Sequence, residues 1–213
     1  MMNLDILTAS RYLKVYNWYT KNFNDDQFIK SISPNQIKPK LWMVDQLSKI
    51  PELNSKKVNV EIVGAWFGWP LIQLLENILE FDKIEIFDLD KNACRVCYQY
   101  RNIFEYSKNQ IGVTNKNYWD CVNRKSNADL IINCSSEHMN ETFYQYNIYK
   151  KNCIFAIQSN NMFDEPDHIN CSKDINELIE KNRIKEIFYS GEMSFNDLNE
   201  NSNYKRFMVI GKL

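Results

Sequence analysis

No apolar run in this 213-residue sequence approaches the roughly 18 residues that a membrane-spanning helix needs. The start of the chain also lacks the basic residues and the long apolar stretch of a secretory signal. We therefore expect a soluble, cytoplasmic protein that does not act at a membrane. In the reducing cytoplasm the six cysteines are expected to be free thiols rather than disulfide bridges.

The sequence also lacks an excess of charge of either sign. The 26 Lys and Arg residues nearly balance the 27 Asp and Glu residues. The chain therefore lacks the broad positive field that draws proteins to the phosphate backbone of nucleic acids. A small-molecule partner is favoured over nucleic acid, and the composition leaves the oligomeric state open.

Linkers and repeats are missing as well. No stretch rich in Pro, Gly or Ser and no run of like charge divides the chain, and no segment repeats. One compact unit is expected, with residues 1–57 as an amino-terminal helical extension or lid and residues 58–213 as a Rossmann-like domain. In the extension, a helix is predicted from an aromatic stripe around Tyr16, and a second helix is predicted after Pro39.

The stretch from Val58 to Asp90 has the order of a nucleotide-binding βαβ unit. A β-rich run enters a turn that contains Gly64 and Gly68, and apolar residues then recur at helical spacing after a proline expected in the first turn of the helix. A second β-rich run ends at Asp88. An acid at that position can hold the hydroxyl groups of a ribose, whereas Asp90 suits the N-cap of the next helix.

The rest of the chain continues the alternation of helices and strands and then ends in two β-rich runs. The expected elements are a helix over 91–106, strands near 110–113, over 128–133 and over 152–158, a helix over 173–182, and runs over 184–189 and 204–211 joined by the polar stretch 190–203. Because no helical pattern separates the last two runs, they should pair antiparallel. The sequence therefore predicts an α/β fold with a doubly wound sheet of about seven strands.

This pattern resembles the class I S-adenosylmethionine-dependent methyltransferase superfamily, whose sheet ends in such a hairpin. The resemblance covers roughly residues 58–213 and implies the strand order 3-2-1-4-5-7-6, S-adenosyl-L-methionine as cofactor, and methyl transfer to a small-molecule acceptor. In that family the first strand leads into an acid-x-Gly-x-Gly-x-Gly turn. Here Gly64 and Gly68 take the first and third glycine positions. Trp66 replaces the middle glycine, and the acid is displaced to Glu61.

The resemblance also implies which residues hold the cofactor. Asp88 matches the acid that binds both ribose hydroxyls, and Leu89 matches the following residue, which packs on adenine. A solvated acid at a strand end is the alternative role for Asp88. Asn115 or Asn117 could supply a polar contact to adenine. The candidate cofactor-binding residues are Gly64, Ala65, Trp66, Gly68, Asp88, Leu89 and Asn133.

The segment that follows the fourth expected strand is the best candidate for chemistry. It lacks the Asp/Asn-Pro-Pro-aromatic turn of enzymes that methylate exocyclic amino groups of nucleic acids, which argues against that class. His138 could act as the catalytic residue by accepting a proton from an acceptor hydroxyl or amine. The alternative is a structural histidine, bonded to Glu137 or to the backbone. The candidate substrate-binding residues are Gln158, Asn160, Asn161, His168 and Trp42.

Two pairs of residues have the spacing of zinc ligands, Cys94 with Cys97 and His168 with Cys171. In the expected strand order these pairs follow strands that lie roughly 14 Å apart, at about 4.8 Å per strand step. One ion cannot bridge that distance, so no metal site is predicted. Cys94 and Cys97 are assigned to the core instead.

The departure at Trp66 leaves other functions open. The spacing Gly-x-x-x-Gly-x-Pro-Leu is similar to the corresponding turn of nicotianamine synthases, so aminocarboxypropyl transfer or cleavage of the cofactor is one alternative. A Rossmann-like protein that binds a nucleotide or a partner chain without catalysis is another. An NAD-dependent dehydrogenase is disfavoured, because its Gly-x-Gly-x-x-Gly pattern is absent.

Overall fold

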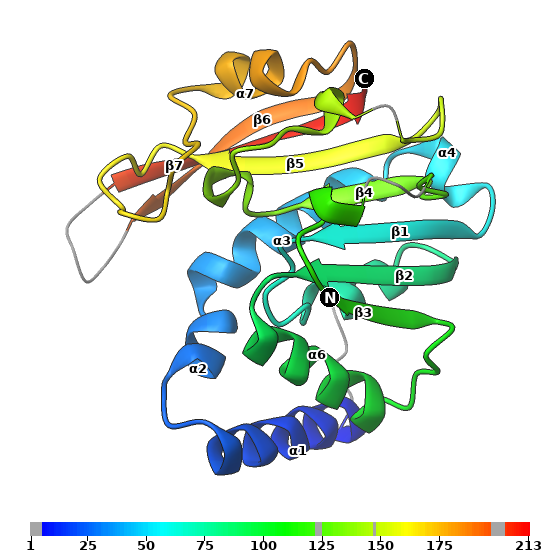
Figure 1. Ribbon diagram of the computed structural model, residues 1–213, viewed down its shortest axis with the longest axis vertical. Helices are drawn as coiled ribbons and strands as arrows, with labels where there is room; N and C mark the ends of the chain where they lie inside the picture. Colours follow the sequence, from blue (N-terminus) through cyan, green and yellow to red (C-terminus); the bar gives the residue numbers. More distant parts are fainter. Residues whose placement is uncertain (1–5, 122–124, 147, 197–202) are drawn as a thin grey trace.

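The computed structural model describes residues 6–121, 125–146, 148–196 and 203–213. In these residues seven strands form one sheet, in the order β3-β2-β1-β4-β5-β7-β6 (Figure 1). The strands are β1 Val58–Val63, β2 Phe81–Asp88, β3 Ile111–Asn115, β4 Leu130–Asn133, β5 Ile154–Asn160, β6 Glu186–Asn196 and β7 Asn203–Lys212. Strands β1 to β5 pair in parallel, and β7 pairs antiparallel with both β5 and β6. The predicted strand order and the antiparallel ending are thus confirmed.

Helices and short 3₁₀ turns connect the strands. They are α1 Ile6–Asn22, α2 Gln27–Ser31, α3 Pro34–Leu47, α4 Pro51–Asn54, α5 Leu71–Glu76, α6 Lys91–Ile103, η1 Trp119–Cys121, η2 Ser136–His138, η3 Phe143–Gln145 and α7 Ile175–Asn182. None of the described helices combines the length and the apolar character that a bilayer crossing requires.

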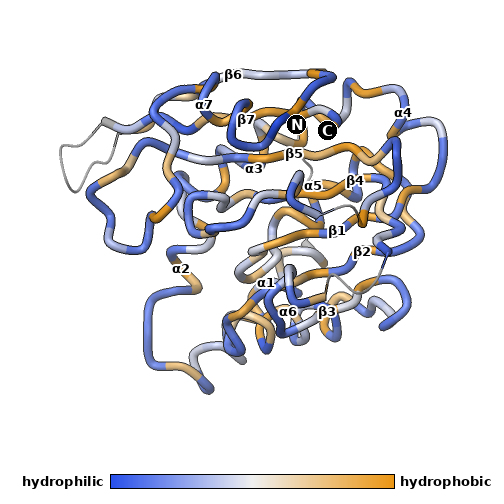
Figure 2. The backbone as a smooth tube through the Cα atoms, turned by 45° about the horizontal axis from the view of Figure 1, so that its top comes forward, coloured by the Kyte–Doolittle hydropathy of each residue, from blue (hydrophilic) through white to orange (hydrophobic). Residues whose placement is uncertain are grey.

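The sheet is buried on both faces, which explains the nearly continuous apolar sequences of its parallel strands. In β1, Ile62 packs into a core shared with α1, α3, α5 and α6, whereas Val63 packs into a second core on the opposite face. The second core contains Leu178 of α7 and aromatic residues near the 3₁₀ turns. Figure 2 shows that the hydrophobic residues concentrate along the central strands.

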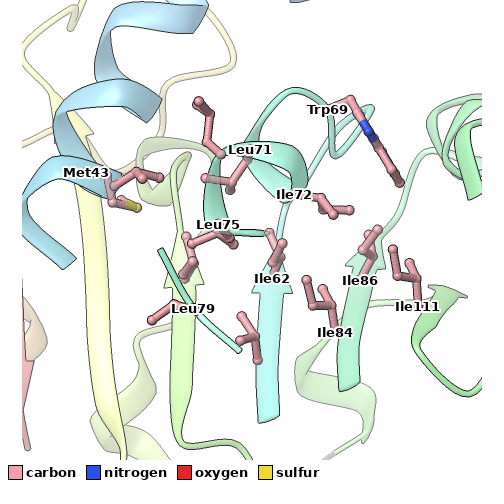
Figure 3. Packing of buried hydrophobic residues seen from close by; sticks show 14 of the residues in the cluster. Met43, Ile62, Trp69, Leu71, Ile72, Leu75, Leu79, Ile84, Ile86 and Ile111 are labelled. Carbon is pink, nitrogen blue, oxygen red and sulfur yellow. The ribbon is translucent and has the colours of Figure 1, made fainter. Parts of the chain in front are cut away.

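The amino-terminal helices contribute to the first of these cores. Val15 and Tyr19 of α1 and Met43 and Leu47 of α3 are buried in the same cluster as the central strands. Figure 3 shows Met43 close to Leu75 of α5. Residues 6–57 therefore help to cover one face of the sheet, because their apolar stripes pack on the helices that follow β1 and β2.

Two elements differ most from the bounds expected from sequence, whereas the others differ by at most three residues at an end. Helix α3 begins at Pro34, because the fixed φ of proline suits the first helical position, and it contains Pro39 in its interior instead of beginning after it. Strand β6 extends to Asn196, into the stretch 190–203 that was expected to be a polar connection. Its antiparallel pairing with β7 supplies backbone hydrogen bonds whatever the side chains are. Residues 197–202 of that stretch lie outside the described part of the chain.

Candidate functional site

A cavity of about 550 Å³ lies at the carboxyl ends of β1, β2 and β4. Its walls include Gly64 and Trp66 after β1, residues 87–90 at the end of β2, residues 116–119 after β3, and Ser135, His138 and Met139 after β4. Gln36 of α3 and Asp167 after β5 also line it. The chain order reverses between β1 and β4. Open α/β sheets bind their ligands at such a reversal, outside the carboxyl ends of the strands.

The turn after β1 has left-handed backbone at three positions. Gly64, Trp66 and Gly68 have φ angles of 63°, 50° and 71°. A Cβ atom makes this conformation unfavourable. Trp66 nevertheless adopts the backbone conformation expected of a glycine, and its indole ring forms part of the cavity wall. The ring stacks on Phe67 with centroids 5.0 Å apart.

We expect the variant Trp66→Gly to be more stable than Trp66→Ala by about 1–2 kcal/mol. Both substitutions remove the same ring, but alanine keeps the Cβ atom that makes a φ of 50° unfavourable. Urea unfolding of the two variants measures the difference in free energy. Greater stability of the alanine variant, the usual order in regular structure, would show that the protein in solution lacks left-handed backbone at this position.

Two other residues of this turn, and the proline that follows it, do not face the cavity. A Cβ atom on Gly68 would lie 3.3 Å from Ile86 and 3.4 Å from the Sγ atom of Cys97, so this glycine allows close packing in the core. Ala65 is not part of the cavity wall either. Pro70, expected in the first turn of the helix, is instead the N-cap residue of α5.

Asp88 ends β2 at the cavity wall, and two backbone groups hold its carboxylate. Oδ2 accepts a hydrogen bond from the N–H of Trp66 at 2.7 Å, and Oδ1 accepts one from the N–H of Asp90 at 2.8 Å. Burial raises the pKa of this carboxyl, and the two hydrogen bonds partly oppose the shift. Each oxygen keeps a further lone pair, so the carboxylate can also accept from two ligand hydroxyls.

The residues next to Asp88 have separate roles. Leu89 lines the cavity with 70% of its surface exposed, which leaves an apolar face for a ligand. Asp90 caps α6 by accepting from the N–H of Asn92 at 2.7 Å, as predicted. Asn115 donates to the carbonyl of Leu89 at 2.9 Å, whereas Asn117 lines the cavity.

Glu61, the acid that precedes the position expected from the family motif, does not line the cavity. It is buried in β1, where its carboxylate accepts from the hydroxyl of Tyr118 at 2.7 Å and from that of Ser126 at 3.0 Å. Tyr118 and Trp119 in turn form a cavity wall. Sequence reasoning missed both aromatic residues because β3 was poorly marked. Their position directly after that strand is the signal that could have indicated them.

His138 ends the turn η2 and lines the cavity, with 38% of its side chain exposed. Its Nδ1 lies 3.1 Å from the backbone oxygen of Asp167. Its ring packs edge-on against the ring of His168, with centroids 4.6 Å apart. Asn133 was expected to contact the cofactor, but it is buried and accepts from the N–H of Ser135 at 2.9 Å. The segment after β4 therefore presents a histidine to the cavity and keeps its asparagine inside.

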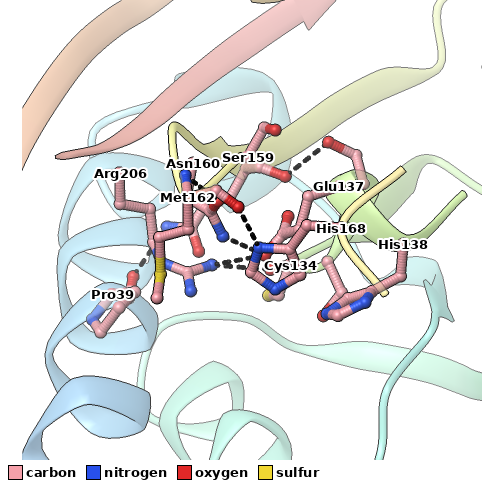
Figure 4. A network of polar contacts seen from close by, with 12 residues as sticks. Pro39, Cys134, Glu137, His138, Ser159, Asn160, Met162, His168 and Arg206 are labelled. Carbon is pink, nitrogen blue, oxygen red and sulfur yellow. Dashed lines mark hydrogen bonds and ion pairs between the residues drawn. The ribbon is translucent and has the colours of Figure 1, made fainter. Parts of the chain in front are cut away.

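A buried ion pair lies beside this segment, as Figure 4 shows. Oε1 of Glu137 accepts from Asn160 at 2.8 Å and lies 3.5 Å from Nη1 of Arg206. Arg206 also donates to the carbonyl of Cys134 at 3.1 Å. Burial raises the pKa of the Cys134 thiol, whereas the positive charges of Lys40 and Arg206 oppose that shift. This network joins the end of β4 to β5 and β7, and no pattern in the sequence indicated it.

The predicted substrate-binding residues lie outside the cavity wall. His168 is the nearest, through its contact with His138. Gln158 and Asn160 are completely buried and bonded within the protein. Asn161 accepts from a backbone N–H of β7 at 2.8 Å, and Trp42 donates to a tyrosine of β6 at 3.0 Å. Any contact of these residues with a substrate remains a prediction.

The two residue pairs with the spacing of zinc ligands lie in separate parts of the fold. Cys94 and Cys97 are buried in α6, and Cys97 belongs to the first core, as predicted. Burial raises the pKa of the Cys94 thiol to about 11. Cys171 is buried beyond β5, where its thiol contacts Asn160. A thiol with a raised pKa is a poor metal ligand, since metals bind the thiolate.

No family model and no curated protein matches this chain. Solved structures do match it. A candidate sarcosine dimethylglycine methyltransferase from Galdieria sulphuraria has 10% identity and a TM-score of 0.63 over 82% of this chain and 85% of its own. The O-methyltransferase from Bacillus cereus, in complex with S-adenosylhomocysteine, has 13% identity and a TM-score of 0.58 over 94% and 90%.

The N-methyltransferase NodS from Bradyrhizobium japonicum, also with S-adenosyl-L-homocysteine, has 11% identity and a TM-score of 0.57 over 94% of this chain and 98% of its own. Such likenesses establish for this chain the Rossmann-like fold of class I S-adenosylmethionine-dependent methyltransferases. At these identities they establish the fold alone.

Proposed function

We propose that this chain, which has the fold of class I S-adenosylmethionine-dependent methyltransferases, binds S-adenosyl-L-methionine and transfers its methyl group to a small-molecule acceptor in the cytoplasm. The observation that carries the proposal is the cavity at the strand ends, where the turn after β1, the carboxylate of Asp88 and His138 meet. The balanced charge of the chain favours a small acceptor over nucleic acid.

The cavity residues suggest how the cofactor would lie. Asp88 would accept hydrogen bonds from the ribose hydroxyls, and Leu89 and Asn117 would face the adenine. The methionine part would then extend past Gly64 toward Ser135 and the segment after β4. This arrangement is supported by the strand order β3-β2-β1-β4, whose carboxyl ends carry these residues of the cavity wall.

Methyl transfer needs little acid-base chemistry from the protein. The acceptor atom forms a bond to the methyl carbon while the bond from that carbon to sulfur breaks, and the sulfur keeps the electron pair. Holding the two reactants in line supplies most of the rate. His138 is proposed to accept the proton that the acceptor loses, because it is the histidine in the cavity wall.

Calorimetric titration with S-adenosyl-L-methionine and S-adenosyl-L-homocysteine, with NAD as control, tests the proposal. We expect both adenosyl ligands to bind and NAD not to bind. Mass spectrometry of the bound S-adenosyl-L-methionine after incubation without an acceptor should find it intact, which would justify a screen of acceptors. Failure of both adenosyl ligands to bind would overturn the proposal.

Cleavage of the cofactor, or transfer of its aminocarboxypropyl group, is the second candidate. One observation favours it: Trp66 places an indole where the methyltransferase motif has a glycine, and the ring could change how the cofactor lies. Formation of methylthioadenosine in the incubation without an acceptor would replace methyl transfer with this chemistry.

A further inference from the structure

We propose that Glu137, His138 and His168 form a binding site for a divalent transition-metal ion beside the cavity. One possible ligand atom from each of the three side chains lies within 4.8 Å of the other two. Two imidazoles and one carboxylate are a ligand set that proteins use for Zn²⁺, Fe²⁺ and related ions. The site differs from the cysteine and histidine pairs considered in the sequence, and it joins η2 to the connection after β5.

The carboxylate of Glu137 gives the second and independent indication. Its side chain is only 2% exposed, and Oε1 accepts from Asn160 and lies beside Arg206. Oε2 is buried and has no hydrogen-bond partner among the described residues. Leaving a buried carboxylate oxygen without a partner is costly, so natural proteins rarely do it without an ion or a water molecule at that point. A cation coordinated by Oε2 would satisfy it.

Both histidine rings make a hydrogen bond that is common among metal ligands. Nδ1 of His138 lies 3.1 Å from the backbone oxygen of Asp167, and Nδ1 of His168 lies 3.2 Å from that of Met162. A carbonyl oxygen only accepts, so each Nδ1 carries the hydrogen and each Nε2 keeps its lone pair. Histidine ligands are commonly held in this way, with the second nitrogen bonded to a carbonyl.

A small closure would bring the three groups to coordination distance. Ligands with bonds of about 2.1 Å to one tetrahedral ion lie about 3.4 Å apart, so the ligand atoms must approach by roughly 1.4 Å at most. The side chain of His138 is 38% exposed, which leaves it room to turn. Glu137 is fixed by its buried contacts and would serve as the anchor.

Three protein ligands leave at least one position of the ion open. His138 is part of the cavity wall, so an oxygen atom of the acceptor could take that position. This last step rests on the proposed function, whereas binding of the ion does not. With an ion present, His138 would be a ligand and would not accept the proton. The ion would instead lower the pKa of a bound acceptor hydroxyl, whose proton would pass to water.

The site is tested by titrating the protein with Mn²⁺. Binding is measured as the loss of the free Mn²⁺ signal in electron paramagnetic resonance. Mn²⁺ is chosen because it suits carboxylate and other oxygen ligands and not soft thiolates, so the cysteines do not compete. We expect wild-type protein to bind a single Mn²⁺, and His168→Ala and Glu137→Gln to bind it at least roughly 100-fold more weakly. Asp164→Asn, which removes a charge from the same connection outside the three ligands, should bind Mn²⁺ as the wild type does.

Circular dichroism and thermal unfolding in the presence of a chelator check that each variant is folded. His168→Ala keeps the test decisive if Glu137→Gln does not fold, because His168 takes no part in the buried ion pair. Absence of Mn²⁺ binding, or equal affinity in wild type and His168→Ala, would overturn the metal site. Titration of the same samples with S-adenosyl-L-homocysteine keeps the proposed function separate, since it can succeed or fail independently of Mn²⁺.

Discussion

Replacing Asp88 with asparagine is expected to weaken the binding of S-adenosyl-L-homocysteine by about 100-fold or more. Hydrogen bonds to a charged group contribute about 1.5–3 kcal/mol each, and the carboxylate of Asp88 is proposed to accept from two ribose hydroxyls. The loss should be large because the carboxylate is already oriented by the N–H groups of Trp66 and Asp90. Calorimetric titration of the folded variant measures it.

Asp82→Asn is the matched control for this prediction. It removes the same charge from an exposed position near the beginning of β2, outside the cavity wall. Its affinity for S-adenosyl-L-homocysteine should therefore stay within a few-fold of the wild type. If Asp88→Asn binds as tightly as this control, Asp88 is not the ribose ligand and acts only in holding the turn after β1.

Replacing Arg206 with methionine is expected to lower the free energy of unfolding by about 3–5 kcal/mol, the cost of leaving one member of a buried ion pair without its partner. The Arg206 and Glu137 side chains are 10% and 2% exposed, so water cannot compensate the stranded carboxylate. The carbonyl of Cys134 also loses its donor. Urea unfolding in the presence of a chelator measures the change without a contribution from bound metal.

Two controls isolate the effect of burial. Lys205→Met removes a cation from the neighbouring position of β7, where Lys205 pairs with Glu192 at 2.6 Å and both side chains are almost half exposed. Exposed pairs contribute about 0–1 kcal/mol, so this variant should lose little stability. The double variant Arg206→Met with Glu137→Gln should regain part of the loss. Similar losses for Arg206→Met and Lys205→Met would show that the pair is solvated in solution.

Both proposals depend on residues that sequence reasoning recognised in part. The strand that ends at Asp88 and the histidine after β4 could be located from the sequence, because each follows a run of apolar residues with a clear β pattern. The partner of Glu137 could not. Arg206 lies on the last strand, and no local pattern shows that it reaches the end of β4.

Local sequence also could not show which polar side chains at the strand ends are buried. Gln158 and Asn160 lie at the end of β5, next to residues that were interpreted as a polar loop. They were therefore predicted to contact a substrate. They are completely buried, because α3 and η2 pack against that part of β5. A polar side chain at a strand end is exposed or enclosed according to what packs beside it.

The sequence by itself determined the class of fold and the acid at the end of β2, because the period of apolar residues and the turn residues act over a few positions of the chain. The order of the strands was implied by the resemblance to a known family. The tertiary structure alone decided that Trp66 adopts left-handed backbone and that Glu137 meets Arg206. It also brought Glu137, His138 and His168 together. Such contacts join residues far apart in the chain, and their geometry is set by how the layers pack rather than by any local preference.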